Sequence, residues 1–74
     1  MGARDAQLAL QEAERARAGE LALYELTLAR LYLEKAREEA SEAHYALALR
    51  LLQRSEESAH AALTRAERTP RAAR

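Results

Sequence analysis

Hydrophobic residues recur at helical spacing along most of the chain, and the stretch from Tyr24 to Ala40 has the broadest apolar surface. On a helix that turns by about 100° per residue, its apolar side chains cover more than half of the circumference. One neighbouring helix cannot bury so broad a surface, so we expect this stretch to lie centrally, between two other helices or in an oligomer interface. The apolar positions are Tyr24, Leu26, Leu28, Ala29, Leu31, Tyr32, Leu33, Ala36 and Ala40.

Residues 3–18 contain no glycine, proline or β-branched residue, and their apolar positions also follow a helical period. Most of these positions are alanines, which bury little area but allow two helix backbones to approach closely. Asp5 suits the first turn, where a carboxylate interacts favourably with the free N–H groups. Gly19 follows the end of the pattern and predicts a C-terminal cap, with a helix kinked through Gly19 as the alternative. We expect a thin first helix that covers one side of the central stretch.

A third helix is predicted over residues 42–68, with Ser41 as its N-cap. Thr69-Pro70 should end it, because the residue before a proline is disfavoured in the α conformation. Neither glycine nor proline occurs at residues 40–44, so an uninterrupted rod is an alternative to a turn. A turn is favoured because a rod would leave apolar surfaces on both segments exposed. The apolar face of this helix comprises Tyr45, Ala48, Leu49, Leu52, Ala59, Leu63 and Ala66.

These patterns predict an all-α fold, a three-helix antiparallel bundle in which a short alanine-rich helix packs on a long helical hairpin. A single domain should span residues 1–69, and residues 70–74 are expected to form a flexible basic tail. The large apolar residues predicted to form the core or an interaction surface are Tyr24, Leu28, Leu31, Tyr32, Leu33, Tyr45, Leu49, Leu52 and Leu63.

The composition narrows the classes of function. Twelve basic and twelve acidic side chains are interleaved along the chain, and the net charge of zero argues against a nucleic-acid-binding face. No apolar run approaches the roughly 20 residues of a transmembrane helix. The chain has no cysteine, which excludes disulfides and thiolate metal sites. Because most apolar residues are alanine, with no Phe or Trp, the core should be shallow and self-association is expected.

Two pieces of the central stretch are distinctive, YELT at residues 24–27 and YLEKAREEA at residues 32–40. Together with Tyr45 and Ala48, they resemble an uncharacterised helical domain family of exported Gram-negative proteins. Members of that family are often outer-membrane lipoproteins and sometimes carry an OmpA-like peptidoglycan-binding domain. The resemblance implies a helical architecture and a location in the periplasm or at the outer membrane. It implies no reaction, since the family has no established activity.

The spacing of Tyr45, Ala48, Leu52 and Ser55 is similar to that in the second helix of a tetratricopeptide unit. Only one such unit is present, whereas repeat solenoids generally need about three stacked units. We therefore interpret this TPR-like spacing as ordinary packing within a helical hairpin.

Glu57 and His60 form the most specific candidate for a metal site, a Glu-x-x-His motif on a helix. Ferritin-like di-iron proteins combine this motif with an inward glutamate from a facing helix, here Glu25, and dimerisation of two half-sites would complete the site. Helical phase argues against it, because Glu57 points away from the face that contains Leu52. Glu25 is instead predicted to bond to a tyrosine or to an arginine such as Arg17, since an unpaired buried carboxylate is costly.

No glycine-rich phosphate loop, nucleophile elbow or Ser-His-Asp set occurs in the sequence. We therefore predict a non-catalytic helical interaction or scaffold module of the bacterial cell envelope, without a cofactor or a metal. A protein partner is expected, and this partner could be a second copy of the same chain. The alternatives are the ferritin-like di-iron half-site at Glu25, Glu57 and His60, completed by dimerisation, and a coiled-coil assembly element that forms a rod.

Overall fold

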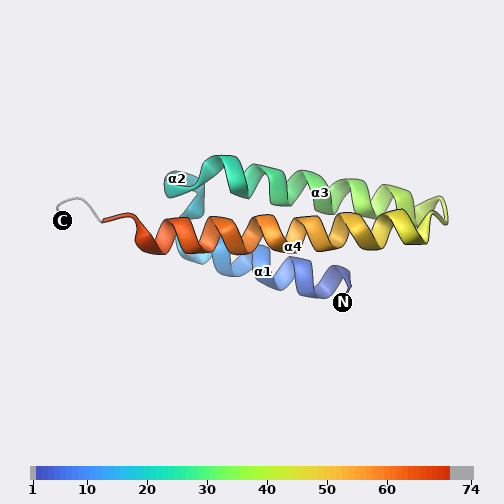
Figure 1. The fold of residues 1–74 in the computed structure, drawn as a ribbon, viewed down its shortest axis with the longest axis horizontal. Helices are drawn as coiled ribbons and strands as arrows, with labels where there is room; N and C mark the ends of the chain where they lie inside the picture. The colour runs from blue at the N-terminus through green and yellow to red at the C-terminus, as the bar shows by residue number, and fades with distance from the viewer. Residues whose placement is uncertain (1, 71–74) are drawn as a thin grey trace.

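The computed structural model describes residues 2–70, and their secondary structure consists of four helices. α3 and α4 run antiparallel as a long hairpin, and α1 lies along one side of it, antiparallel to α3 (Figure 1). The prediction of an all-α bundle with a short helix on a long hairpin is confirmed, and the one-turn helix α2 is an addition to it. The helices are α1 (Ala3–Arg15), α2 (Ala18–Leu21), α3 (Leu23–Ser41) and α4 (Tyr45–Arg68).

The structure has a turn at residues 40–44, and not the continuous helix that was the alternative prediction. The molecule measures 49 × 18 × 13 Å between Cα atoms, whereas a continuous helix over residues 3–68 would extend to about 100 Å. The rod-like coiled-coil interpretation is therefore wrong. Of the tail expected at residues 70–74, residues 71–74 lie outside the described part of the chain.

α4, rather than the stretch from Tyr24 to Ala40, occupies the centre of the bundle. It packs against α3 along its length and also contacts α1 and α2, while α1 has only a minor contact with α3. The inward positions of α4 alternate in steps of four and three residues, as in a coiled-coil seam. Small side chains at most of these positions let both neighbouring helices approach closely. The buried residues of α4 are Ala48, Leu52, Ser55, Ala59, Ala62 and Ala66.

The core consists mainly of alanine, as the composition predicted. Eleven of the fourteen buried hydrophobic residues in the described chain are alanines, and the other three are Leu26, Leu33 and Leu52. α3 contributes an inward row with the same alternating spacing as α4, which we define as the inner seam. The inner seam comprises Ala22, which is the N-cap of α3, and the α3 residues Leu26, Ala29, Leu33 and Ala36.

A side-chain hydrogen bond crosses this core. The Oγ atom of Ser55, a fully buried residue of α4, donates a 2.7 Å hydrogen bond to the backbone carbonyl of Ala29 in α3. The hydroxyl therefore has the partner that burial requires. A bond of this length also means that the two helices lie very close together at this level.

The predicted core residues divide into two groups. Leu33 and Leu52 are buried, and Leu28, Tyr32 and Leu63 are half-buried. The other four are exposed, so they do not belong to the core of the single chain, and their part in an interaction surface stays a prediction. These four are Tyr24 (70% exposed), Leu31 (54%), Tyr45 (64%) and Leu49 (53%).

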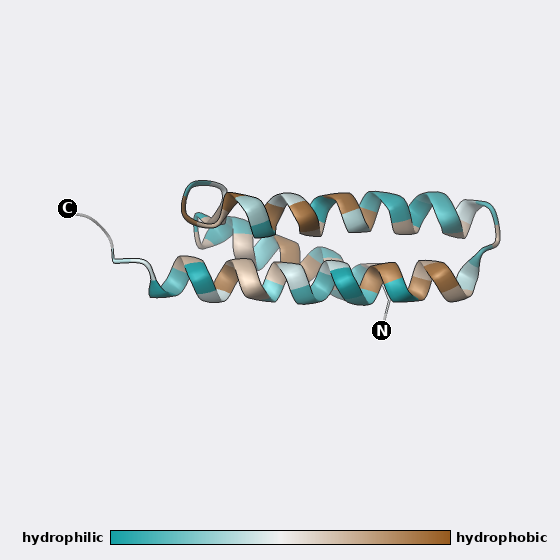
Figure 2. Ribbon diagram, turned by 45° about the horizontal axis from the view of Figure 1, so that its top comes forward, coloured by the Kyte–Doolittle hydropathy of each residue, from teal (hydrophilic) through white to brown (hydrophobic). Residues whose placement is uncertain are grey.

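Different causes expose these residues on the two helices. On α3, the inner seam faces α4 and α1, which turns Tyr24 and Leu31 outward. On α4, Tyr45 and Leu49 lie next to the hairpin turn, and α1 is too short to reach them (Figure 1). Figure 2 shows the resulting distribution, with hydrophobic residues along the first part of α3 and in the part of α4 next to the turn.

The turn between α3 and α4 uses a left-handed residue, Ala43, with a φ of 64°. The N–H of Ala43 donates to the carbonyl of Ala40 (3.0 Å), and the N–H of His44 donates to the carbonyl of Glu39 (2.8 Å). These two bonds define a Schellman motif, in which the left-handed position is usually glycine. The turn predicted at residues 40–44 is therefore confirmed, although the sequence has no glycine there to mark its left-handed position.

The other predicted helix ends are partly correct. α4 ends at Arg68, directly before Thr69-Pro70, as predicted. Ser41 is not the N-cap of α4, because α3 continues through this residue. Gly19 does not cap α1 either, since the left-handed residue is Arg17 (φ 66°) and Gly19 lies within α2.

Candidate functional site

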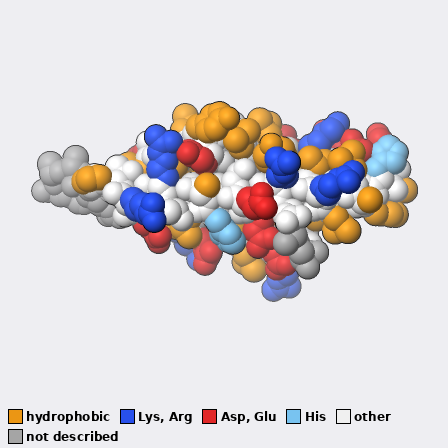
Figure 3. Space-filling model, viewed as in Figure 1, with side chains coloured by type: hydrophobic (Ala, Val, Ile, Leu, Met, Phe, Trp, Pro, Cys, Tyr) orange, Lys and Arg blue, Asp and Glu red, His pale blue; other side chains and the backbone are white. Residues whose placement is uncertain are grey.

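α3 carries a second row of residues with coiled-coil spacing, on the side away from its inner seam. Tyr24, Leu28, Leu31 and Lys35 follow one another in steps of four, three and four residues, and we define them as the outer seam. Tyr24 and Leu31 are more than half exposed, and Leu28 is half-buried. Figure 3 shows a run of hydrophobic side chains along the α3 edge of the molecule. α3 therefore presents leucine and tyrosine to solvent in the same pattern with which it packs on α4.

A groove lies beside the outer seam, between α3 and α4. It is lined by Tyr32 of α3 and by six residues of α4, two leucines and four polar or charged residues: Leu47, Arg50, Leu51, Gln53, Arg54 and Glu57. No residue of α1 lines this groove, because α1 borders α4 and α3 along other grooves. We define the open face as the outer seam together with this groove. Its apolar members are Tyr24, Leu28, Leu31, Tyr32, Leu47 and Leu51.

A charged pair joins the two hairpin helices at the end away from the turn. The Nη1 atom of Arg65 donates a 2.9 Å hydrogen bond to Oε2 of Glu25. A hydrogen bond from its own backbone N–H, and then the bond from Arg65, lower the pKa of Glu25. The prediction that Glu25 pairs with an arginine is confirmed, but the partner is Arg65. Arg17, the partner suggested by the sequence, pairs with Glu20 instead.

The three residues of the di-iron hypothesis do not converge in the described chain. Glu25 is bonded to Arg65, and Glu57 lines the groove that contains Tyr32. His60 is exposed and lines a different groove, between α1 and α4. The described chain therefore forms no metal site from Glu25, Glu57 and His60 by itself.

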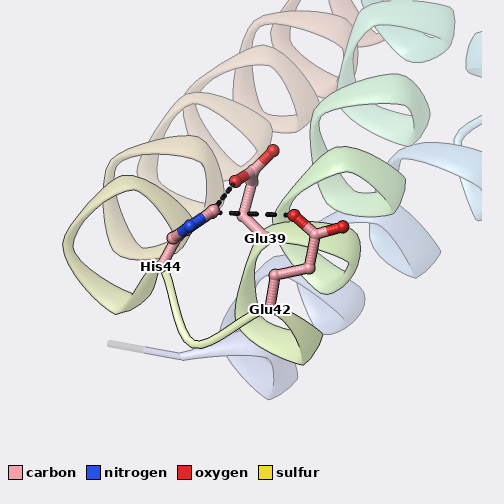
Figure 4. Close-up of side chains that lie close together, drawn as sticks. All are labelled: Glu39, Glu42 and His44. Carbon is pink, nitrogen blue, oxygen red and sulfur yellow. Dashed lines mark hydrogen bonds and ion pairs between the residues drawn. The ribbon is translucent and has the colours of Figure 1, made fainter.

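A cluster at the hairpin turn was missed in the sequence (Figure 4). The Nδ1–H of His44 donates to Oε1 of Glu39 at 2.7 Å, and the same nitrogen lies 3.7 Å from Oε1 of Glu42. Among residues 2–70 these are the one group of three His, Asp or Glu side chains whose ligand atoms lie within 4.8 Å of one another. No sequence motif announces the cluster, because His44 reaches Glu39 only through the left-handed turn at Ala43.

The contacts of this cluster indicate a structural role. The Nζ atom of Lys35 lies 3.3 Å from the second carboxylate oxygen of Glu39, so a side-chain cation already faces this carboxylate. Hydrogen bonds from His44 and then from Lys35 lower the pKa of Glu39, and Glu39 in turn raises the pKa of Lys35. His44 follows the end of α3, where its backbone N–H bonds the Glu39 carbonyl while its side chain bonds the Glu39 carboxylate. We therefore interpret the cluster as a cap of α3.

Comparison with known proteins identifies no family. No protein-family model, curated protein or solved structure matches the chain. None of the described helices combines the length and the apolar character needed to cross a membrane. The resemblance to exported helical domains therefore stays a prediction.

Proposed function

We propose that this chain is a non-catalytic helical interaction module that binds a helical partner through its open face. The observation that supports this proposal is the outer seam. α3 has coiled-coil spacing on two sides, but residues 2–70 cover only the inner seam. A helix that is apolar around most of its circumference is normally buried on all of those sides. The outer seam is therefore the place where α3 lacks a neighbour.

Covering the open face would remove apolar area from water, which contributes roughly 25 cal/mol per Å². Contiguous exposed apolar patches commonly mark interaction surfaces. Tyr24 and Tyr32 are suitable anchors, because tyrosine is enriched among the residues that dominate binding energy. Lys35 and Arg54 supply the polar rim that such interfaces usually have.

The proposed location is the bacterial cell envelope, in the periplasm or at the outer membrane. Its support is the resemblance of residues 24–27 and 32–40 to exported helical domains. Fractionation of native cells, followed by detection with a specific antibody, tests this part of the proposal. We expect the protein in the periplasmic or outer-membrane fraction, and recovery in the cytoplasmic fraction alone would contradict it.

Photo-crosslinking tests the interaction itself. A photoreactive amino acid replaces Leu31 on the open face or, as the matched control, Leu8, a leucine of α1 with similar exposure (50% against 54%). After irradiation of cells that express the protein naturally, we expect adducts of defined mass from position 31 and few from position 8. Equal yields from the two positions would contradict the proposal. Mass spectrometry of the adducts shows whether the partner is another protein or a second copy.

A further inference from the structure

We infer that the open face binds a second copy of this chain, with α3 of one copy antiparallel to α3 of the other across a two-fold axis. This inference rests on the proposed function and specifies its partner. A two-fold interface uses the same surface on both copies, so the surface must be complementary to itself.

The outer seam is self-complementary in an antiparallel alignment. Its four residues are arranged symmetrically about its own midpoint, with steps of four, three and four residues. With the two-fold axis at that midpoint, Leu28 faces Leu31 of the second copy, and Tyr24 faces Lys35 of the second copy. Four leucines therefore form the centre of the contact, and the longer side chains close its ends.

Charge favours the antiparallel alignment over the parallel one. A parallel pair with its seams in register would place Lys35 opposite Lys35 of the second copy, and like charges repel. In the antiparallel pair Lys35, which is paired with Glu38 and Glu39 of its own chain, lies beside the uncharged Tyr24 of the second copy, so this repulsion is avoided. The formal net charge of zero also means that two copies do not repel each other at long range.

The two grooves remain at the sides of such a pair. The outer seam lies on the side of α3 away from the inner seam, so α4 of each copy lies on the far side of its own α3 from the contact. Each groove is lined by Arg50, Arg54 and Glu57 as well as by Tyr32, Leu47 and Leu51, and these charged side chains stay accessible to water in the pair.

The length of α3 sets the size of the contact. Its 19 residues extend over about 28 Å, and a helix is about 10 Å across. A strip of this size offers roughly 300 Å² per copy, below the ~800 Å² that each partner buries in a standard interface, so the dimer should be weak and form as the concentration rises.

Sedimentation equilibrium of the purified chain tests the inference. We expect the mass to rise from 8.3 kDa towards twice that value as the concentration increases. Leu31→Glu places a charge at the centre of the contact and should raise the dimer Kd by at least about thirty-fold, the effect of a hot-spot residue. Leu8→Glu makes the same exchange at a similarly exposed leucine of α1 and should leave the Kd unchanged.

Disulfide trapping tests the alignment, and the sequence has no cysteine that would interfere. Chains with Leu28→Cys are mixed with chains with Leu31→Cys and then oxidised. The antiparallel alignment predicts cross-links mainly between the two kinds of chain, because a disulfide requires Cα atoms within about 7 Å. Cross-links mainly between identical chains would indicate a parallel pair and overturn the inference.

A monomer at every concentration would also overturn it, as would an equal loss of dimer in Leu31→Glu and Leu8→Glu. Circular dichroism establishes that both variants are folded, which their exposed positions lead us to expect. Failure of this inference is distinct from failure of the proposed function. A monomer that still gives adducts with another protein from position 31 retains the interaction function, whereas a monomer without such adducts loses both.

Discussion

The two faces of α3 have the same residue spacing but different surroundings. The inner seam is covered by α4 and α1, and none of its members is more than 4% exposed. The outer seam contains bulkier apolar residues, yet exposure reaches 70% at Tyr24. The larger side chains are therefore not the ones that this bundle buries. The side chains of the neighbouring helix decide which face of α3 turns inward.

The surface of α4 explains this choice. Its inward row consists of four alanines, Leu52 and Ser55, so a facing helix can approach closely only with small side chains of its own. The inner seam supplies these small side chains, and Ser55 then reaches the Ala29 carbonyl. A tyrosine in their place would hold the two backbones apart and break this hydrogen bond.

The largest difference between the two faces should appear when leucines are truncated. Leu26→Ala removes a fully buried side chain and should lower the free energy of unfolding by about 2–5 kcal/mol. Leu31→Ala alters a residue that is 54% exposed and should lower it by less than about 0.5 kcal/mol. Urea titration at a concentration where the chain is monomeric measures both values. Equal losses would contradict the assignment of the two faces.

Enlarging an alanine should give the next largest difference. Ala59→Leu inserts three carbons into the fully buried row of α4 and should lower the free energy of unfolding by about 1–3 kcal/mol. Ala61→Leu, at an exposed position of the same helix, should change it by no more than about 0.5 kcal/mol. Thermal melting followed by circular dichroism compares the two variants. A stabilised Ala59→Leu protein would show that the helices are not in close contact there.

Acid should weaken the charged contacts that hold α3 in this orientation. The pKa of Glu39 is lowered by hydrogen bonds from His44 and Lys35, and that of Glu25 by its own backbone N–H and Arg65. Both folded-state pKa values lie below the ordinary value of 4.5, so their stabilising contribution is complete above that pH and is lost as the pH falls below it.

The melting temperature should therefore decrease below pH 4.5, and the decrease should be smaller in Glu39→Gln, which has one titrating carboxylate fewer. A pH series of thermal melts provides the measurement. Parallel curves for the two proteins would show that Glu39 does not contribute.

The smallest expected effect concerns the turn that sets the orientation of α3 against α4. An alanine in the left-handed conformation destabilises the folded state by roughly 1–2 kcal/mol, and glycine does not have this strain. Part of the benefit is offset because glycine loses more backbone entropy than alanine on folding. Ala43→Gly should therefore raise the free energy of unfolding by up to about 1 kcal/mol. Ala40→Gly, three residues earlier and within α3, should instead lower it by about 0.5–1 kcal/mol. Shifts of the same sign in urea titrations would refute this account of the turn.

The helices and the shallow core could be predicted from the sequence, because apolar periodicity and alanine content are local properties of the chain. The orientation of α3 could not be predicted in the same way. Both of its seams have coiled-coil spacing, and size alone favours burial of Tyr24 and Leu31. The choice depends on the alanine row of α4, a helix that follows α3 in the sequence. The orientation of α3 could have been predicted by aligning its row of small residues with the alanine row of α4.

The contacts at the candidate site could be predicted only in part from the sequence, again because they depend on the tertiary structure. Glu25 was expected to have an arginine partner, but Arg65 lies forty residues further along the chain, and no local pattern links the two. The contact between His44 and Glu39 depends on the backbone conformation of Ala43. Left-handed alanine and arginine carry no signal comparable to glycine. The sequence therefore predicts the end of the first helix at Gly19 instead of near Arg17, and the start of the third helix at residue 42 instead of Tyr45, although the turn itself lies within the predicted residues 40–44.

The short alanine-rich α1 has a consequence for the motions of the molecule. Its buried residues are Ala6, Ala9 and Ala13, and its ion pair with α3, between Glu14 and Arg30, is exposed and contributes little. α1 should therefore detach locally long before the hairpin opens, and its amide hydrogens should exchange with solvent faster than those in the middle of α4. Each local detachment of α1 would briefly expose the alanine-rich side of α4 to solvent. The hairpin of α3 and α4 would stay intact while α1 leaves and returns.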